Sequence, residues 1–250
     1  MGQGKYSPEW FYSESQTPEW ISFAHKADEL REKFYKSFWN RTLKITFWKR
    51  FVNFFIYNDE GTKTNLCYRL EMDKDIREVF GSISGGAAYK FGLFYHKKNQ
   101  SWTCGSPLKP IHLTEDEAIQ KAEEMRNDLV EGAEIISSFG PLDSEKDYEQ
   151  LYKQLEHIPG INMVWRMKYY QMLFPTLFAP FYGQDIQLRV LHFLNQKPSD
   201  IPFIRMGQIS LYARKCNVPG VVFAHIYGKN VGYTNETNDS DTNTLSDKKT

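Results

Sequence analysis

The sequence has few cysteines, and this scarcity limits the kinds of site that it can hold. The 250 residues include only Cys67, Cys104 and Cys216, which are dispersed and odd in number. Such a pattern forms neither a disulfide framework nor a zinc site, and it favours a reducing compartment. The histidines form no HxH or HExxH motif. We therefore expect no metal and no cofactor.

The sequence also lacks the short motifs of common catalytic sites. Residues 81–86, GSISGG, are glycine-rich but lack the lysine of a nucleotide-binding phosphate loop. No GxSxG nucleophile elbow is present. Adjacent carboxylates such as Glu123 and Glu124 are most simply the solvated face of an amphipathic helix. We therefore expect this chain to have no enzymatic activity of its own.

Long apolar runs are missing as well. None approaches the ~18 residues of a membrane-spanning helix, and the N-terminus has no charged-then-apolar signal region. We therefore expect a cytoplasmic protein with no membrane partner. Residues 229–250 are dominated by Asn, Asp, Ser and Thr, a composition that predicts a disordered tail or linker.

Acidic residues are missing from two long stretches, although the net charge of the chain is zero. Residues 33–58 contain Lys and Arg but no Asp or Glu, and residues 79–114 contain Lys but no Asp or Glu. In residues 115–149, by contrast, acidic residues far outnumber basic ones. This segregation indicates a basic face and an acidic face. Two ordinary solvated faces explain the pattern equally well.

Residues 89–136 contain the clearest structural signals. Hydrophobic residues alternate at the start, as in a half-buried strand: Phe91, Leu93 and Tyr95. Residues 97–100 predict a polar turn, and residues 101–105 a return strand. Glycine and proline are expected to end that strand: Gly105, Pro107 and Pro110.

A helix is expected directly after this hairpin. Thr114 followed by Glu117 is a capping-box signature, in which each side chain bonds to the other residue's backbone amide. The spacing of the apolar residues places four of them on one stripe: Ala118, Ala122, Met125 and Leu129. A hairpin covered by a helix is a plausible centre for a domain.

The rest of the chain divides at Gly140-Pro141. Before the hairpin we expect a loosely docked arm over residues 1–17, a helix over 18–37, strands over 41–57 and 64–71, and a helical turn over 75–80. After residue 141 we expect helices near residues 144–155, 164–173, 185–195, 209–216 and 218–227. The predicted class is α+β, with a small mixed-sheet domain over residues 1–140 and an all-α domain over 141–228.

Two segments of the chain carry a family resemblance. They are residues 91–136, FGLFYHKKNQSWTCGSPLKPIHLTEDEAIQKAEEMRNDLVEGAEII, and residues 168–195, KYYQMLFPTLFAPFYGQDIQLRVLHFLN. The first resembles the N-terminal region of McrB-type AAA+ proteins, the GTP-hydrolysing subunits of modification-dependent restriction systems. The second resembles a segment that follows the recognition region in such proteins. The resemblance implies a DNA-reading module with a PUA-like fold, akin to EVE and YTH domains, which flip a modified base into an aromatic cage. It also implies two partners, an AAA+ GTPase motor and a nuclease subunit, which would hold any NTPase or nuclease activity.

Basic residues interleaved with aromatic residues indicate where DNA would bind. Lys and Arg neutralise phosphates, and stacking on an aromatic ring contributes ~1–3 kcal/mol per base. The predicted base-binding pocket consists of Trp39, Trp48, Tyr95 and Trp102. The predicted backbone contacts are Lys44, Lys49, Arg50, Lys97, Lys98 and Lys109. For the three tryptophans, a place in the hydrophobic core explains the pattern about equally well.

Two alternative functions remain open. Residues 209–227 have the apolar spacing of a helix-turn-helix, but the second helix offers only His225 and Lys229 to bases. The second alternative is a non-catalytic adaptor that binds other proteins through the acidic helix and the helical domain. If the chain has no affinity for DNA at low salt, the adaptor function is favoured.

Overall fold

The computed structural model describes residues 6–38, 66–83, 92–96, 99–106 and 109–231. Over these residues the protein is mostly helical, with one three-stranded antiparallel sheet, so the predicted α+β class is confirmed. The elements before the sheet are α1 (Pro8–Ser15), α2 (Pro18–Phe38), α5 (Leu66–Glu71) and α6 (Lys74–Phe80). The sheet and its helix are β1 (Leu93–His96), β2 (Ser101–Ser106), β3 (Lys109–Leu113) and α8 (Glu115–Ser138). The remaining helices are α9 (Glu145–Leu155), α10 (Met163–Leu173), α11 (Gln184–Phe193), α12 (Pro202–Lys215) and α13 (Gly220–Val231).

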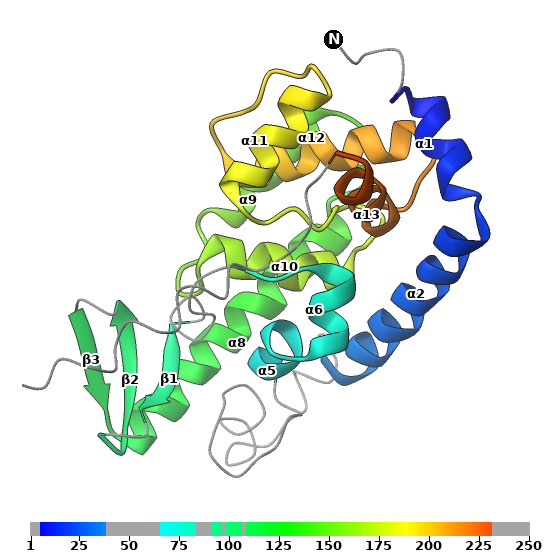
Figure 1. Ribbon diagram of the computed structural model, residues 1–250. Helices are drawn as coiled ribbons and strands as arrows, with labels where there is room; N and C mark the ends of the chain where they lie inside the picture. Colours follow the sequence, from blue (N-terminus) through cyan, green and yellow to red (C-terminus); the bar gives the residue numbers. More distant parts are fainter. Residues whose placement is uncertain (1–5, 39–65, 84–91, 97–98, 107–108, 232–250) are drawn as a thin grey trace, which may run out of the picture.

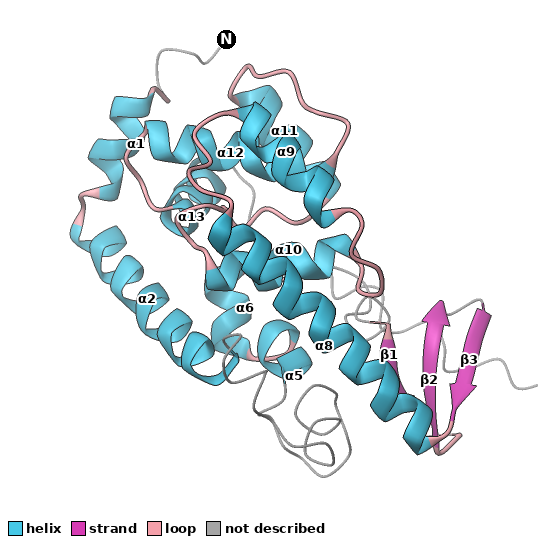
Figure 2. Ribbon diagram, turned by 180° about the vertical axis from the view of Figure 1, so that it is seen from behind, coloured by secondary structure: helices cyan, strands magenta, loops and turns pink. Residues whose placement is uncertain are grey.

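The elements gather in two parts. The sheet lies at one end of the molecule, and α8 runs from it into the group of other helices (Figures 1 and 2). We call β1–β3 and α8 the sheet layer, and the other described helices the helical body. Hydrophobic side chains from both parts join in one buried cluster.

The sheet has the strand order β1-β2-β3. The predicted β1–β2 hairpin is confirmed, and β2 ends at Ser106, beside Gly105, as expected. The helix does not follow the hairpin directly, however. Instead, Pro110 lies within β3, an outer strand of the three, where a residue without an amide proton can be accommodated. Gly105 allows the close approach of β2 and β3, because its φ is +87° and a Cβ there would lie 2.8 Å from the carbonyl oxygen of Lys109.

Helix α8 begins at the predicted capping box. The Glu117 amide donates to Thr114 Oγ1 at 3.3 Å, and the Thr114 amide donates to Glu117 Oε2 at 2.7 Å. The helix contacts all three strands. The predicted stripe is confirmed, because all four residues are buried: Ala118, Ala122, Met125 and Leu129.

Two predictions for the N-terminal third are wrong. Residues 66–71 are the helix α5 and not a strand, because Leu66 and Leu70, one helical turn apart, are both fully buried while Tyr68 is only partly buried. Residues 8–15 are the helix α1 and not a loose arm. Ser7 caps α1 by accepting from the Trp10 amide, and the fully buried Phe11 packs on Phe223 of α13 with ring centroids 4.7 Å apart. The strand and turn predicted within residues 41–61 lie outside the described residues.

Helix α10 is the central helix of the helical body. Every residue from Trp165 to Leu173 is buried, and the helix contacts α2, α8 and α12. Close backbone approach also occurs between α9 and α12, because Gly207 lies against the ring of Tyr148, and a Cβ there would be 2.4 Å from that ring. The helices predicted after residue 141 are confirmed, although α12 begins earlier than expected, at Pro202.

The predicted domain boundary near residue 140 falls in the connection between α8 and α9. Helices from both sides of it pack together: α1 and α2 contact α13, and α2 contacts α10. α13 continues to Val231, slightly past the predicted end of the helical domain. The division into two domains stays a prediction.

Candidate nucleic-acid interface

The register of the sheet determines which strand residues share a face. Trp102 lies opposite Tyr95 of β1 and Leu113 of β3, so these three side chains project from one face. Trp102 and Leu113, with Leu93 and Cys104, pack against the buried cluster to which α8 contributes. This is therefore the face that α8 covers.

Two of the four predicted pocket residues form a contact on this face. The rings of Tyr95 and Trp102 meet edge to face, with centroids 5.2 Å apart and an interplanar angle of 68°. Both side chains are only partly buried, so each ring retains solvent-accessible surface. Trp102 consequently combines a packing contact with an accessible aromatic surface that a planar base could contact.

Lys109 does not join this pair. It is exposed and lies opposite Ser106, at the other end of β2 from Trp102. At about 3.4 Å per residue, the two positions are about 14 Å apart along the strand. The role of Lys109 as a contact to the DNA backbone stays a prediction. The other predicted residues lie outside the described residues: Trp39, Lys44, Trp48, Lys49, Arg50, Lys97 and Lys98.

The opposite face of the sheet carries polar residues that the sequence did not single out. Ser101 Oγ lies 3.1 Å from Nδ1 of the exposed His112. Thr103, the direct partner of His112 across the two strands, is only 2% exposed, and its hydroxyl has no hydrogen-bond partner within the part of the chain that the structure describes. The strand alternation was a usable signal for this face, because Ser101 and Thr103 alternate with Trp102 and Cys104.

The charged surface of α8 is largely solvated. Its first turn is acidic, and Lys121 pairs with Glu124 of the same helix at 2.9 Å. A shallow hollow of about 280 Å³ lies along the same helix and is lined by Arg126, Asn127, Val130, Glu131 and Glu134. Hydrogen bonding to the Thr114 backbone and hydroxyl lowers the pKa of Glu117. These features describe an acidic, capped helix surface.

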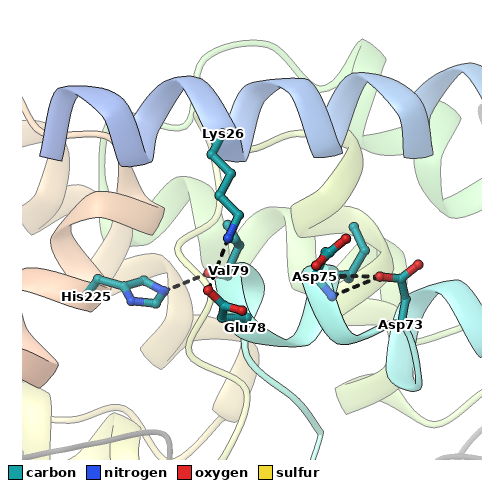
Figure 3. Close-up of polar contacts among 7 residues, drawn as sticks. Lys26, Asp73, Asp75, Glu78, Val79 and His225 are labelled. Carbon is teal, nitrogen blue, oxygen red and sulfur yellow. Dashed lines mark hydrogen bonds and ion pairs between the residues drawn. The ribbon is translucent and has the colours of Figure 1, made fainter. Parts of the chain in front are cut away.

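A second hollow, of about 300 Å³, lies where α2 meets α5 and α6. Its lining residues are Leu30, Lys33, Phe34, Ser37, Phe38, Arg69, Asp73, Asp75 and Ile76. Arg69 forms an ion pair with Asp73, and Asp73 also caps α6 by accepting from the amides of Asp75 and Ile76 (Figure 3). These charges are thus already used to hold the two short helices together.

The helix-turn-helix alternative required His225 and Lys229 to be available to DNA bases. His225 instead points from α13 toward α6, where its Nε2 lies 2.8 Å from the carbonyl oxygen of Val79 (Figure 3). Burial lowers the pKa of His225. Lys229 forms an ion pair with Glu19 of α2 at 2.7 Å and lies over the Trp20 ring. Both side chains therefore join α13 to the neighbouring helices.

All three cysteines are free. Within residues 6–38, 66–83, 92–96, 99–106 and 109–231, no group of three or more His, Cys, Asp or Glu side chains is placed to hold a metal ion. No helix in those ranges has the length and apolar character needed to cross a membrane.

Comparison of the chain with protein-family models, with curated proteins and with solved structures found no match. The resemblance to the McrB-type region therefore depends on the two segments quoted above.

Proposed function

We propose that this chain is the DNA-recognition module of a modification-dependent restriction system. In this proposal, the sheet layer is part of a PUA-like domain and holds a modified base, flipped out of the duplex, against Tyr95 and Trp102. The motor and nuclease activities belong to partner proteins or domains, and the module acts in the cytoplasm. The observation that supports the proposal best is the partly buried contact between these two rings on neighbouring strands.

The position of this contact suits base recognition. Tyr95 and Trp102 lie close to the turn between β1 and β2, and that turn contains Lys97 and Lys98 in the sequence. Ammonium groups near the site would neutralise phosphates and hold the backbone, while the rings supply stacking surface. Phosphate contacts carry little sequence information, so discrimination between modified and plain DNA would depend on the rings.

The decisive experiment removes one ring. Affinity is measured for plain duplexes and for duplexes with methylated cytosine, hydroxymethylated cytosine or methylated adenine. For the preferred duplex, we expect Trp102→Ala to lower affinity about tenfold, because base stacking contributes about 1–3 kcal/mol. Affinity for the plain duplex should change little.

The chain offers a matched control in Trp10. It is also partly buried and meets a tyrosine edge to face, with its centroid 4.9 Å from that of Tyr6, but it lies on α1 in the helical body. Trp10→Ala should lower the melting temperature without changing discrimination. If Trp102→Ala likewise lowers only the melting temperature, the base-binding role of Trp102 is wrong.

A salt titration tests the electrostatic part of the proposal. Affinity should fall steeply as salt rises, because bound lysines release counterions from DNA. The double reversal Lys97→Glu/Lys98→Glu should weaken binding to all duplexes alike. Unchanged binding after this reversal would place the phosphate contacts elsewhere on the protein.

The adaptor function remains a second candidate because of the hollow on α8. Its lining mixes an apolar residue with charged and amide side chains, a composition that suits a protein segment better than a nucleic acid: Arg126, Asn127, Val130, Glu131 and Glu134. A wild-type chain without DNA affinity at low salt would favour this candidate. Glu131→Lys should then weaken binding to the protein partner, whereas DNA binding by the proposed module should not be weakened.

A further inference from the structure

A histidine lies where α2, α6 and α13 meet. His225 of α13 is partly buried, and its ring lies against that of Phe23 in α2, with centroids 4.3 Å apart. Its Nε2 lies 2.8 Å from the carbonyl oxygen of Val79 in α6 (Figure 3). A carbonyl oxygen can only accept, so Nε2 carries a hydrogen and donates it. The neutral ring is sufficient for this contact, so His225 can join α13 to both other helices without a charge.

Among the described residues, charged groups from all three helices lie near His225. Lys26 of α2 and Glu78 of α6 form an ion pair at 3.1 Å beside it (Figure 3). One turn further along α13, Lys229 pairs with Glu19 of α2 at 2.7 Å. Each pair is electrically neutral, so neither supplies the net negative charge that would compensate a protonated imidazole ring.

Burial is the largest influence on the affinity of His225 for a second proton. It lowers the pKa of His225 below the ordinary value of 6.5. The hydrogen bond to Val79 and the charge of Glu78 oppose this effect, and the charge of Lys26 adds to it. The unfolded chain therefore takes up the proton at a higher pH than the folded chain. The contribution of His225 to stability is fully present above the ordinary pKa and is lost as the pH falls through the folded-state pKa.

The end of α6 is also held from another side, independently of His225. Lys168 of α10 donates to the carbonyl oxygen of Gly81 at 2.7 Å and forms a buried ion pair with Glu71 of α5 at 2.8 Å. A weaker contact at His225 should therefore open α6 locally, toward α2 and α13, while α5 and α6 stay attached to α10.

We propose that His225 makes the packing of α6 against α2 and α13 sensitive to acid. A proton taken up from solvent at Nδ1 places a positive charge in a partly buried site beside Lys26, and the contact between the three helices weakens. The proposal goes beyond DNA recognition and does not depend on it, because it concerns the response of the helical body to pH.

The first test follows the ring protons of His225 by NMR in the isotope-labelled full chain, from about pH 8 to about pH 4. We expect the midpoint of the titration to lie below 6.5. A midpoint at or above 6.5 would overturn the proposal, because the folded chain would then bind the proton at least as tightly as the unfolded chain does.

The ion pair beside His225 offers two matched variants. Lys26→Met removes a positive charge and should raise the midpoint of His225, whereas Glu78→Gln removes a negative charge and should lower it. Both variants break the same partly exposed ion pair. A loss of packing alone would therefore move the midpoint in one direction in both variants, and shifts of the same sign would count against the proposal.

Thermal melting connects the titration to packing. Acidification from about pH 7.5 to about pH 5 should lower the melting temperature more in wild type than in His225→Gln, whose amide can still donate to Val79 but takes up no proton. Amide exchange should then accelerate in α6 relative to α11 in wild type. His192→Gln, at an exposed position on α11, is the control and should keep the wild-type response.

Equal losses of melting temperature in wild type and His225→Gln would contradict the proposal. If His225→Gln does not fold, the wild-type midpoint and the opposite shifts in Lys26→Met and Glu78→Gln still decide it, because both of those changes are made at partly exposed side chains.

Discussion

The helical body and the sheet layer differ in how completely they bury aromatic side chains. In the helical body, large rings are fully buried, including Trp165, Tyr148 and Phe178. Among the strand residues whose burial is described, only Leu93 and Thr103 are buried, while Tyr95 and Trp102 keep accessible surface. Most of the apolar burial that stabilises the fold is therefore in the helices, whereas Tyr95 and Trp102 of the sheet keep accessible aromatic surface.

The two parts also use polar groups differently. In the helical body, buried polar side chains bond to backbone carbonyls of distant elements, as Lys168 does to Gly81 and Tyr148 does to Leu177. In the sheet, the Ser101–His112 contact lies near the surface and joins neighbouring strands. Buried hydrogen bonds of the first kind define how elements pack, because leaving such a group unpaired costs about 1–3 kcal/mol.

The largest expected effect is on the free energy of unfolding when one of two tryptophans is replaced by alanine. Trp165→Ala, in α10, should lower the free energy of unfolding by about 3–5 kcal/mol, because it leaves a large cavity in a fully buried site. Trp102→Ala should cost less, about 2 kcal/mol, because part of its ring is already exposed. Denaturant unfolding of both variants measures the two losses. Equal losses would show that Trp102 belongs to the core.

Alkaline pH should act on the helical body through its buried tyrosines. Burial raises the pKa of Tyr148 and of Tyr170 to about 12, above the ordinary value of 10. In this range the native state keeps protons that the unfolded chain releases. The contribution of each tyrosine is therefore fully present below pH 10 and is lost as the pH rises through the folded-state value, at a cost of about 2–3 kcal/mol.

Thermal melting between pH 9 and 12 checks this expectation. Tyr148→Phe should remove part of the stability loss at alkaline pH. It also removes the hydrogen bond to Leu177 and therefore lowers stability at neutral pH. Tyr12→Phe, at an exposed position on α1, is the control and should leave the alkaline loss unchanged. If the melting temperature falls equally steeply with pH in wild type and in Tyr148→Phe, the burial of Tyr148 does not cause the alkaline loss of stability.

The close approach of α9 and α12 predicts a smaller effect. Gly207→Ala would place a methyl group 2.4 Å from the Tyr148 ring, so one helix must shift. We expect a loss of about 2 kcal/mol in the free energy of unfolding. Gly183→Ala is the matched control, because its Cβ would meet only Ile186, at an ordinary 3.5 Å. A tolerated Gly207→Ala would mean that the two helices can separate without loss of packing.

The smallest loss of stability is expected from variants of the two capping boxes, one in each part of the molecule. Thr114→Ala at the start of α8 and Ser144→Ala at the start of α9 should each cost about 1 kcal/mol, since both remove a side-chain acceptor for a helix amide. Because α8 contacts all three strands, only Thr114→Ala should also alter amide exchange in the sheet. Equal exchange in both variants would show that the start of α8 does not support the strands.

Local chemistry made several elements predictable. The capping box at Thr114, the alternation through β1 and the 3.6-residue spacing of α8 are properties of short segments, so the sequence indicates them without knowledge of distant contacts. The contact between Tyr95 and Trp102 is of the same kind, because a short hairpin turn brings these two residues together. By contrast, the distance of Lys109 from this pair depends on the register of β3, which the sequence does not indicate.

Other features depend on residues far apart in the sequence. Residues 66–71 alternate in a way that suits a strand, yet burial of Leu66 and Leu70 and the pairing of Glu71 with Lys168 are satisfied by a helix. α1 is held by the contact of Phe11 with Phe223, and Pro110 enters β3 because that strand lies on the outside of the three. The α+β class, the hairpin and the long helices could be predicted from the sequence, because they depend on local hydrogen bonding and periodicity. The way in which α10 joins the other parts could not be predicted, because burial and pairing depend on contacts between segments that no local pattern specifies.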